Sequence, residues 1–205
     1  MLSLVFLSGC SSLPSNLSPV SVEKVADAQA WEMTGKIAIT LPNDKLSSNL
    51  YWLHTSNSDE LTLTTMLGIQ VLSLTQKEGK ARLVVNGETY DDNNAQDLLF
   101  RVTGWTLPID ALPLWITGQL SPTDVVKAKD NQNRPVHVIT QTNPSWHIHY
   151  LRWQQQQGTE LPRLLALNST DIKIKIQINQ WQALAASTNS NRLARTNQAT
   201  STPSI

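Results

Sequence analysis

The sequence has no excess of charge of either sign. Its 205 residues include 16 basic and 16 acidic side chains, and residues 1–9 carry no charge. A protein that binds nucleic acid needs a basic face to neutralise phosphates. The charge balance therefore predicts that nucleic acid is not a partner.

Long apolar runs, cysteine and phenylalanine are also scarce. No run reaches the roughly 20 apolar residues that a membrane-spanning helix needs. Cys10 is the only cysteine, which excludes an internal disulfide and a cysteine metal cluster. Two phenylalanines stand against seven tryptophans. Tryptophan joins a large apolar body to an N–H donor, so it suits a pocket wall or an interface as well as a core.

Signatures of common enzymes are missing too. The chain has no G-x-S-x-G elbow, no Walker loop and no G-x-G-x-x-G. His147 and His149 are two residues apart on one face of an expected strand, but their neighbours supply no carboxylate or thiolate. We therefore expect solvent-facing histidines, no metal site and no enzyme. The other candidates for acid–base chemistry fall in expected turns or at a helix start: Asp91, Asp92, His54, Asp59 and Glu60.

A short apolar stretch ends at Leu7-Ser8-Gly9-Cys10. A small residue before a cysteine allows a signal peptidase to cut there, and the thiol can carry a diacylglycerol. We expect residues 1–9 to be a truncated signal peptide, because it lacks the usual basic start. The mature protein then begins with a diacylglycerol-modified and N-acylated Cys10 as its membrane anchor. Ser11 in place of Asp favours the outer membrane over the inner one.

Composition divides the rest of the chain into three parts. Residues 10–30 hold the lipid attachment site, a Ser/Pro-rich tether and a short helix expected over 22–30. Residues 31–182 are patterned throughout and predict one domain. Residues 183–205 lack aromatic residues and periodicity, so we expect them to be disordered.

Apolar and polar residues alternate along most of the domain, which is typical of strands wet on one face. The period changes at Ala95–Val102, where Asn93 and Gln96 are expected to cap a helix that Gly104 ends. A second short helix is expected over 110–117. A long one-sided sheet must curl, and helices across its mouth would cover an apolar cavity. The expected strands are 31–41, 48–55, 60–65, 69–76, 81–85, 88–90, 123–128, 136–140, 145–153, 161–167 and 172–181.

One connection between strands has an unusual composition. Met66 and Leu67 are large apolar residues at a turn, next to Gly68, where small polar residues are ordinary. Two interpretations remain open from the residues alone. Either Met66 and Leu67 bend back into the core, or they form a protruding finger for a lipid surface or an acyl-bearing cargo.

Several segments, taken in order, resemble the LolB family of outer-membrane lipoproteins, which receive other lipoproteins. One departure is Met66, which stands where the family pattern has proline. The segments are Cys10 with its lipid-attachment motif, Trp31-Glu32-Met33-Thr34-Gly35-Lys36-Ile37-Ala38, Met66-Leu67-Gly68, Thr103-Gly104-Trp105-Thr106-Leu107-Pro108, Leu114-Trp115-Ile116-Thr117-Gly118, and the closing Ile172-Lys173-Ile174-Lys175-Ile176 with Trp181.

The resemblance implies a mainly β fold: a curved, incomplete antiparallel barrel of about ten to eleven strands, with short helices covering an apolar cavity. It implies a monomer on the periplasmic face of the outer membrane that uses no cofactor. Its partners would be the periplasmic carrier LolA, acylated lipoprotein cargo and outer-membrane phospholipid. Leu67, with Met66 and Gly68, would insert into the membrane. The implied acyl-binding residues are Trp52, Leu63, Trp105, Leu112, Trp115, Ile116 and Trp146.

Two other functions remain open at this point. One is a lipid-anchored β-cup that binds a free hydrophobic ligand and has no part in trafficking. The other is an envelope hydrolase whose activity would depend on His147 or Asp92. The missing nucleophile motif argues against the hydrolase.

Overall fold

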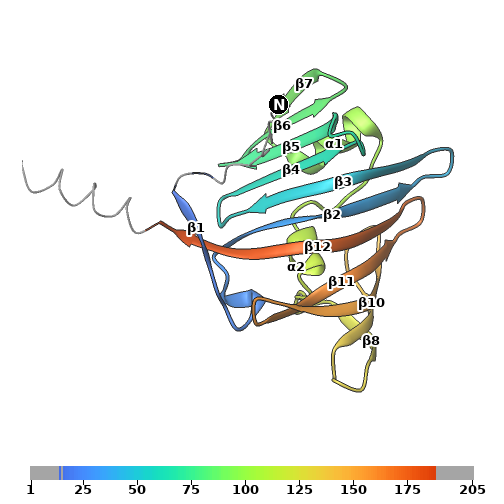
Figure 1. Ribbon diagram of the computed structural model, residues 1–205. Helices are drawn as coiled ribbons and strands as arrows, with labels where there is room; N and C mark the ends of the chain where they lie inside the picture. Colours follow the sequence, from blue (N-terminus) through green and yellow to red (C-terminus); the bar gives the residue numbers. More distant parts are fainter. Residues whose placement is uncertain (1–13, 15, 188–205) are drawn as a thin grey trace, which may run out of the picture.

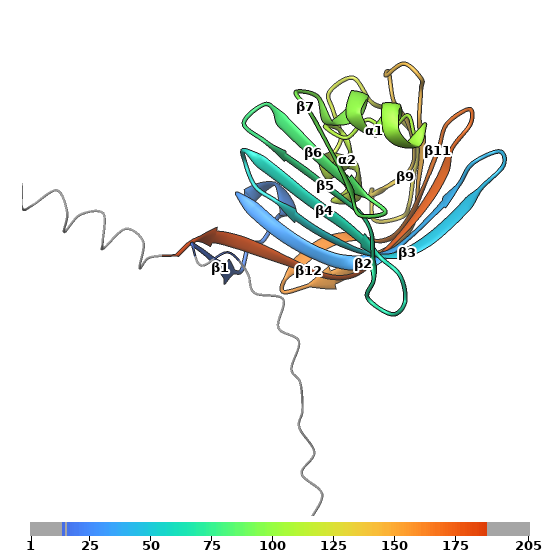
Figure 2. The same cartoon turned by 90° about the horizontal axis from the view of Figure 1, so that it is seen from above.

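The computed structural model describes residue 14 and residues 16–187, in which a single antiparallel sheet of 12 strands curls around two short helices (Figures 1 and 2). The elements are β1 (Leu17–Val20), a 3-10 turn (Val25–Asp27), β2 (Ala30–Thr40), β3 (Lys45–His54), β4 (Ser58–Thr64), β5 (Gln70–Lys77), β6 (Lys80–Val85), β7 (Glu88–Asp92), α1 (Ala95–Thr103), α2 (Leu112–Ile116), β8 (Val125–Lys129), β9 (Pro135–Ile139), β10 (His147–Gln156), β11 (Thr159–Asn168) and β12 (Lys173–Ala186).

The sheet is built from two runs of hairpins that meet at the long strands β2 and β12. Its order is β7-β6-β5-β4-β3-β2-β12-β11-β10-β9-β8, and β1 pairs with the end of β12. Because β7 and β8 are the two ends of this order, the barrel stays incomplete. The expected curved and open antiparallel fold is therefore confirmed.

Alternation along the strands places the apolar side chains on the inner face of the curl. In β12, Ile174, Ile176 and Ile178 are buried while Lys173 and Lys175 are exposed. The inner face of each neighbouring strand adds its own apolar residues to one continuous core. Burial of these side chains is the main source of stability, at about 25 cal/mol per Å² of apolar surface.

Helix α1 lies on the inner side and packs against β5, β6 and β7. Asn94 caps its N-terminus by accepting a hydrogen bond from the Asp97 amide at 2.9 Å. This corrects the expected cap at Asn93 by one residue. Gly104 ends the helix in the left-handed region, at φ 74°, as expected. The chain from Gly104 to Ala111 then crosses to α2, which is shorter than the helix expected over 110–117.

The sheet extends beyond both ends of the domain expected from the sequence. Residues 17–20, assigned to the tether, form β1, and β12 continues to Ala186 inside the expected tail. The helix expected over 22–30 is reduced to the single 3-10 turn. The predictions for the signal segment, Cys10 and residues 188–205 lie outside the described residues. Within the described part, no helix combines the length and apolar character needed to cross a membrane.

Candidate functional site: an apolar cavity and an exposed turn

An apolar cavity lies between the inner face of the sheet and the segment that joins α1 to α2. Every side chain in its wall is hydrophobic, and all except Leu61 and Trp105 are buried. The wall consists of Ile37 and Ile39 from β2, Leu50 and Trp52 from β3, Leu61 and Leu63 from β4, Leu72 and Leu74 from β5, Ile174 and Ile176 from β12, and Leu99, Trp105, Leu107, Ile109 and Leu112 from the helical cover.

The enclosed space is small, at about 30 Å³. A water molecule needs about 10–15 Å³ of such space, so the cavity has room for about two. An acyl chain of many methylene groups therefore fits only when part of the wall moves. Trp105, in the chain between the two helices, and Leu61 of β4 are the half-buried residues of the wall, so the wall reaches solvent at these two places.

A polar cluster outside the cavity fixes the orientation of Trp52. The indole Nε1 of Trp52 donates a hydrogen bond to Asp59 Oδ1 at 2.8 Å, and the same oxygen is 2.8 Å from His54 Nδ1. The ring of Trp31 stacks on His54, with centroids 5.0 Å apart. His54 and Asp59 thus hold a wall residue of the cavity in place.

The seven cavity residues implied by the resemblance fall into two groups. Trp52, Leu63, Trp105 and Leu112 line the cavity. The other three are buried in the core beside it: the rings of Trp115 and Trp146 are 6.2 Å apart, and the Tyr150 hydroxyl donates to the Trp115 carbonyl at 2.9 Å. Those contacts hold α2 against β10, and Ile116 is fully buried beside them.

The β4–β5 connection turns its apolar residues outward. The exposed fraction is 73% for Met66, 87% for Leu67 and 64% for Ile69. The interpretation in which Met66 and Leu67 bend into the core is therefore wrong. Figure 2 shows this loop, drawn in teal, extending beyond the body of the sheet. We call residues 66–69 the apolar tip.

Hydrogen bonds at its base give the apolar tip a defined shape. The Gly68 amide donates to the Thr65 carbonyl at 3.0 Å, and the Thr65 amide donates to the Ile69 carbonyl at 2.8 Å. Gly68 has φ 81°, a value that glycine adopts without strain. The Asn49 side chain also donates to the Thr65 carbonyl, at 3.0 Å. The turn therefore holds its apolar side chains in water, although burial would favour each of them by about 1.5–3 kcal/mol.

Sequence relatives identify the family. Residues 29–181 match the family described as Outer membrane lipoprotein LolB. A relative from Shewanella sediminis, named outer-membrane lipoprotein LolB, is 56% identical over 187 residues, which cover 91% of this chain and 86% of the relative. Another of that name, from Shewanella woodyi, is 50% identical over 200 residues, 97% of this chain and 92% of the relative. The chain belongs to the LolB family of outer-membrane lipoproteins.

Solved structures offer more distant likenesses. A LolA superfamily protein from Nitrosomonas europaea aligns with a TM-score of 0.47 and 7% identity, covering 80% of this chain and 90% of that one. A protein titled putative outer membrane lipoprotein-sorting protein domain, from Vibrio parahaemolyticus, aligns with a TM-score of 0.43 and 8% identity. The alignment covers 82% of this chain and 90% of that one. Membership of the LolB family rests on the sequence relatives and not on these likenesses.

Glu60 is exposed on β4, and the other charged candidates have structural partners in this LolB-family chain. Asp92 accepts a hydrogen bond from Arg101 of α1 at 2.5 Å. That bond, with one from the Asn93 amide, lowers the pKa of the Asp92 carboxyl. Asp91 pairs with Arg82 across the β6–β7 hairpin. The partner of His147 is His137 of β9, with ring nitrogens 3.2 Å apart, whereas those of Asp92 are Arg101 and the Asn93 amide.

Proposed function

We propose that this LolB-family lipoprotein takes acylated lipoproteins from the periplasmic carrier LolA and inserts their acyl chains into the inner leaflet of the outer membrane. Lipoprotein localisation is the role of its family, and no step of it is enzymatic. The carrier, the acyl-bearing cargo and outer-membrane phospholipid are its proposed partners. Cys10, outside the described residues, is the proposed lipid anchor.

The observation that supports this function best is the pairing of a wholly apolar cavity with an exposed apolar tip in one small domain. An acyl chain gains about 0.8 kcal/mol for each methylene group that leaves water. A cavity without a polar side chain in its wall offers that gain without requiring a specific headgroup. The Gly104–Ala111 connection is the part of the wall that we propose to open.

The apolar tip supplies the contact with the bilayer in this proposal. Leu67 is the most exposed of the large hydrophobic residues. Moving Met66, Leu67 and Ile69 from water into lipid would release several kcal/mol together, at about 1.5–3 kcal/mol for each side chain. Such a contact is reversible, which suits a protein that must release its cargo.

The test is a transfer reaction with the full lipidated chain in phospholipid vesicles. LolA loaded with one labelled lipoprotein is added, and the vesicles are floated to measure the cargo that they carry. We expect cargo to move from LolA to the vesicles only when this chain is present. Cargo that stays on LolA while the chain remains folded would reject the transfer function and favour the β-cup that binds a free hydrophobic ligand.

The same assay tests the apolar tip through Leu67→Glu. A buried carboxylate in lipid is costly, so we expect delivery to fall at least tenfold. The midpoint of thermal unfolding should not change, because Leu67 makes no core contact. The matched control is Leu151→Glu, which changes another exposed leucine (51%) on β10 and should leave delivery intact. Equal delivery by Leu67→Glu and the control would contradict the role of the tip.

A further inference from the structure

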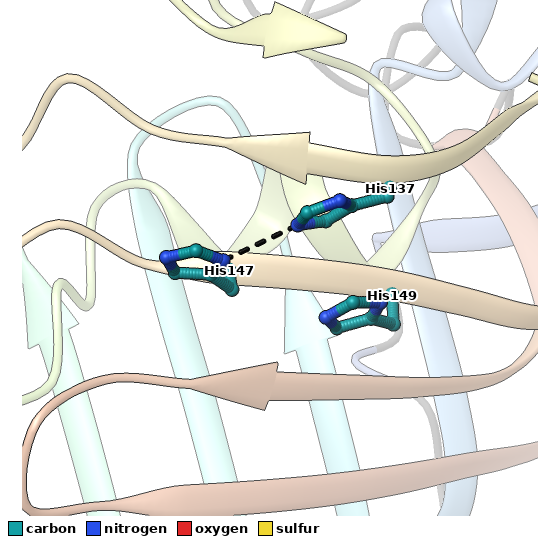
Figure 3. Close-up of side chains that lie close together, drawn as sticks. All are labelled: His137, His147 and His149. Atoms are coloured by element: carbon teal, nitrogen blue, oxygen red, sulfur yellow. Dashed lines mark hydrogen bonds between the residues drawn. The ribbon is translucent and has the colours of Figure 1, made fainter. Parts of the chain in front are cut away.

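Three histidines from two neighbouring strands gather on the outer face of the sheet, away from the cavity (Figure 3). In the register of β9 and β10, His137 stands directly opposite His149, and His147 is two residues further along the same face. The residues between them, Val138 and Ile148, point inward and are fully buried. Strand pairing and alternation thus fix the three imidazoles on one patch.

The ring nitrogens are close enough to share one ion. One ligand nitrogen from each ring lies within 4.8 Å of the other two. His137 Nε2 and His147 Nδ1 are 3.2 Å apart. Two nitrogens bound to one tetrahedral zinc ion at 2.0–2.1 Å are separated by about 3.3 Å. This pair therefore already has the spacing of two zinc ligands.

The third ring must change its direction to bind the same ion. His137 and His149 are stacked, with centroids 4.3 Å apart and planes inclined by 8°. An imidazole binds a metal in the plane of its ring, and the planes of two stacked rings do not meet, so both rings must tilt towards each other to share one ion. His147 is exposed and the other two are half-buried, so an ion and its remaining water ligands can reach the patch from solvent.

The chemistry of the patch favours borderline transition metals. Imidazole binds zinc, copper and nickel, whereas magnesium and calcium require oxygen ligands. Metal binding also requires the neutral ring. Partial burial lowers the pKa of His137, and the nearby His149, His147 and Lys127 lower it further, which agrees with a neutral ring in the periplasmic pH range.

We propose that His137, His147 and His149 form a binding site for a divalent transition-metal ion, with zinc as the representative ligand. Three imidazoles and one or more waters complete its coordination, as in zinc sites that keep an open position. The bound ion takes the place of the proton in the hydrogen bond between His137 and His147, and that proton moves to the other nitrogen of its own ring, which stays neutral. The ion also joins β9 to β10 near one end of the sheet, where β8 is the last strand.

The site is tested with the full chain in detergent micelles, freed of metal by a chelator that is then removed. Zinc is titrated against a coloured competing chelator, and Co²⁺ is added separately because its visible absorption reports tetrahedral nitrogen coordination. We expect one ion per chain. His137→Gln, His147→Gln and His149→Gln should each weaken binding at least tenfold, since each removes a direct ligand.

The fourth histidine of the chain supplies the matched control. His54 lies on β3 with Asp59 as its partner, so His54→Gln should bind zinc as the wild type does. Zinc should also raise the unfolding midpoint of the wild type and of His54→Gln, but not that of His137→Gln. Circular dichroism checks that all four variants are folded. Absence of stoichiometric binding, or equal binding by all four variants, would overturn the proposal.

Discussion

Trp105 differs from most of the cavity wall because its side chain is half-buried and touches both solvent and the apolar interior. In Trp105→Asp, an entering acyl chain must pass a charge that resists desolvation. We expect binding of a fluorescent fatty acid to weaken at least tenfold, with a small change in thermal stability. Trp105→Phe keeps an apolar ring and should retain binding. Fluorescence titration measures both variants, and unchanged binding by Trp105→Asp would place acyl entry elsewhere.

The position of a single site residue can be predicted from the sequence only where its own side chain determines that position. The turn chemistry of Gly68 and the apolar character of Leu67 are readable, but their outward direction depends on the hydrogen bonds that Thr65 makes with its neighbours. Alternation brings Trp52 and Leu63 to the inner face. It cannot separate the cavity wall from the packed core behind it, and neither does the family resemblance, which implies Trp115 and Trp146 as cavity residues.

At the scale of elements, the backbone of β12 lies where a side chain at Gly35 of β2 would be. A Cβ atom at this position would lie 2.1 Å from the carbonyl oxygen of Gln177. Gly35→Ala must therefore push the two central strands apart at the irregular pairing beside Ile178. We expect a loss of about 2–3 kcal/mol in the free energy of unfolding, measured by urea denaturation. Thr34→Ala, the adjacent change in β2, should cost clearly less; equal costs would contradict the close approach.

The pair between Asp92 and Arg101 ties α1 to the end of β7. Because the folded pKa of Asp92 is lowered, first by Arg101, its stabilising effect exists above the unfolded pKa near 3.8 and disappears as the pH falls through the folded value. We expect Asp92→Asn to lower the midpoint of thermal unfolding at pH 7. The difference between its midpoint and that of the wild type should become smaller towards pH 3. Asp91→Asn, on the same hairpin, should have a smaller effect. Thermal unfolding at several pH values measures this, and a difference between the two midpoints that stays constant with pH would contradict the prediction.

Most strands and helices can be predicted from local sequence patterns, whereas the pairing between strands cannot. Asn86 and Gly87 both adopt positive φ in the β6–β7 turn that their sequence predicts. The strand Leu17–Val20 was missed because its Ser/Pro-rich sequence has no alternation, and only pairing with β12 makes it a strand. His137 escaped notice for a similar reason: the register of β9 with β10 brings it opposite His149.

At the scale of the whole molecule, β1 joins the beginning of the described chain to its end. Leu17 packs with Ala30, Leu53 and Leu184, and Val20 packs against the main core. Replacing both with serine (Leu17→Ser, Val20→Ser) should cost about 1–3 kcal/mol, since both side chains are half-buried. Urea unfolding of the full chain in detergent measures this. An unchanged free energy of unfolding would show that β1 adds no stability.

The pairing of β1 with β12 also sets the length of the tether between the lipid anchor and the domain. With Cys10 acylated, only six residues lie between Cys10 and Leu17, and the contour length of this segment is at most about 25 Å. If the sheet began at Trp31, 20 residues would lie between Cys10 and the sheet, and they would span up to about 70 Å. The contour length sets the radius within which the domain can move around its anchor. With the shorter length, the accessible volume is on the order of twentyfold smaller than with the longer one, and the local concentration of the domain at the bilayer surface rises in proportion. The four residues of β1 thus keep the domain, with the apolar tip that we propose to insert, close to the lipid.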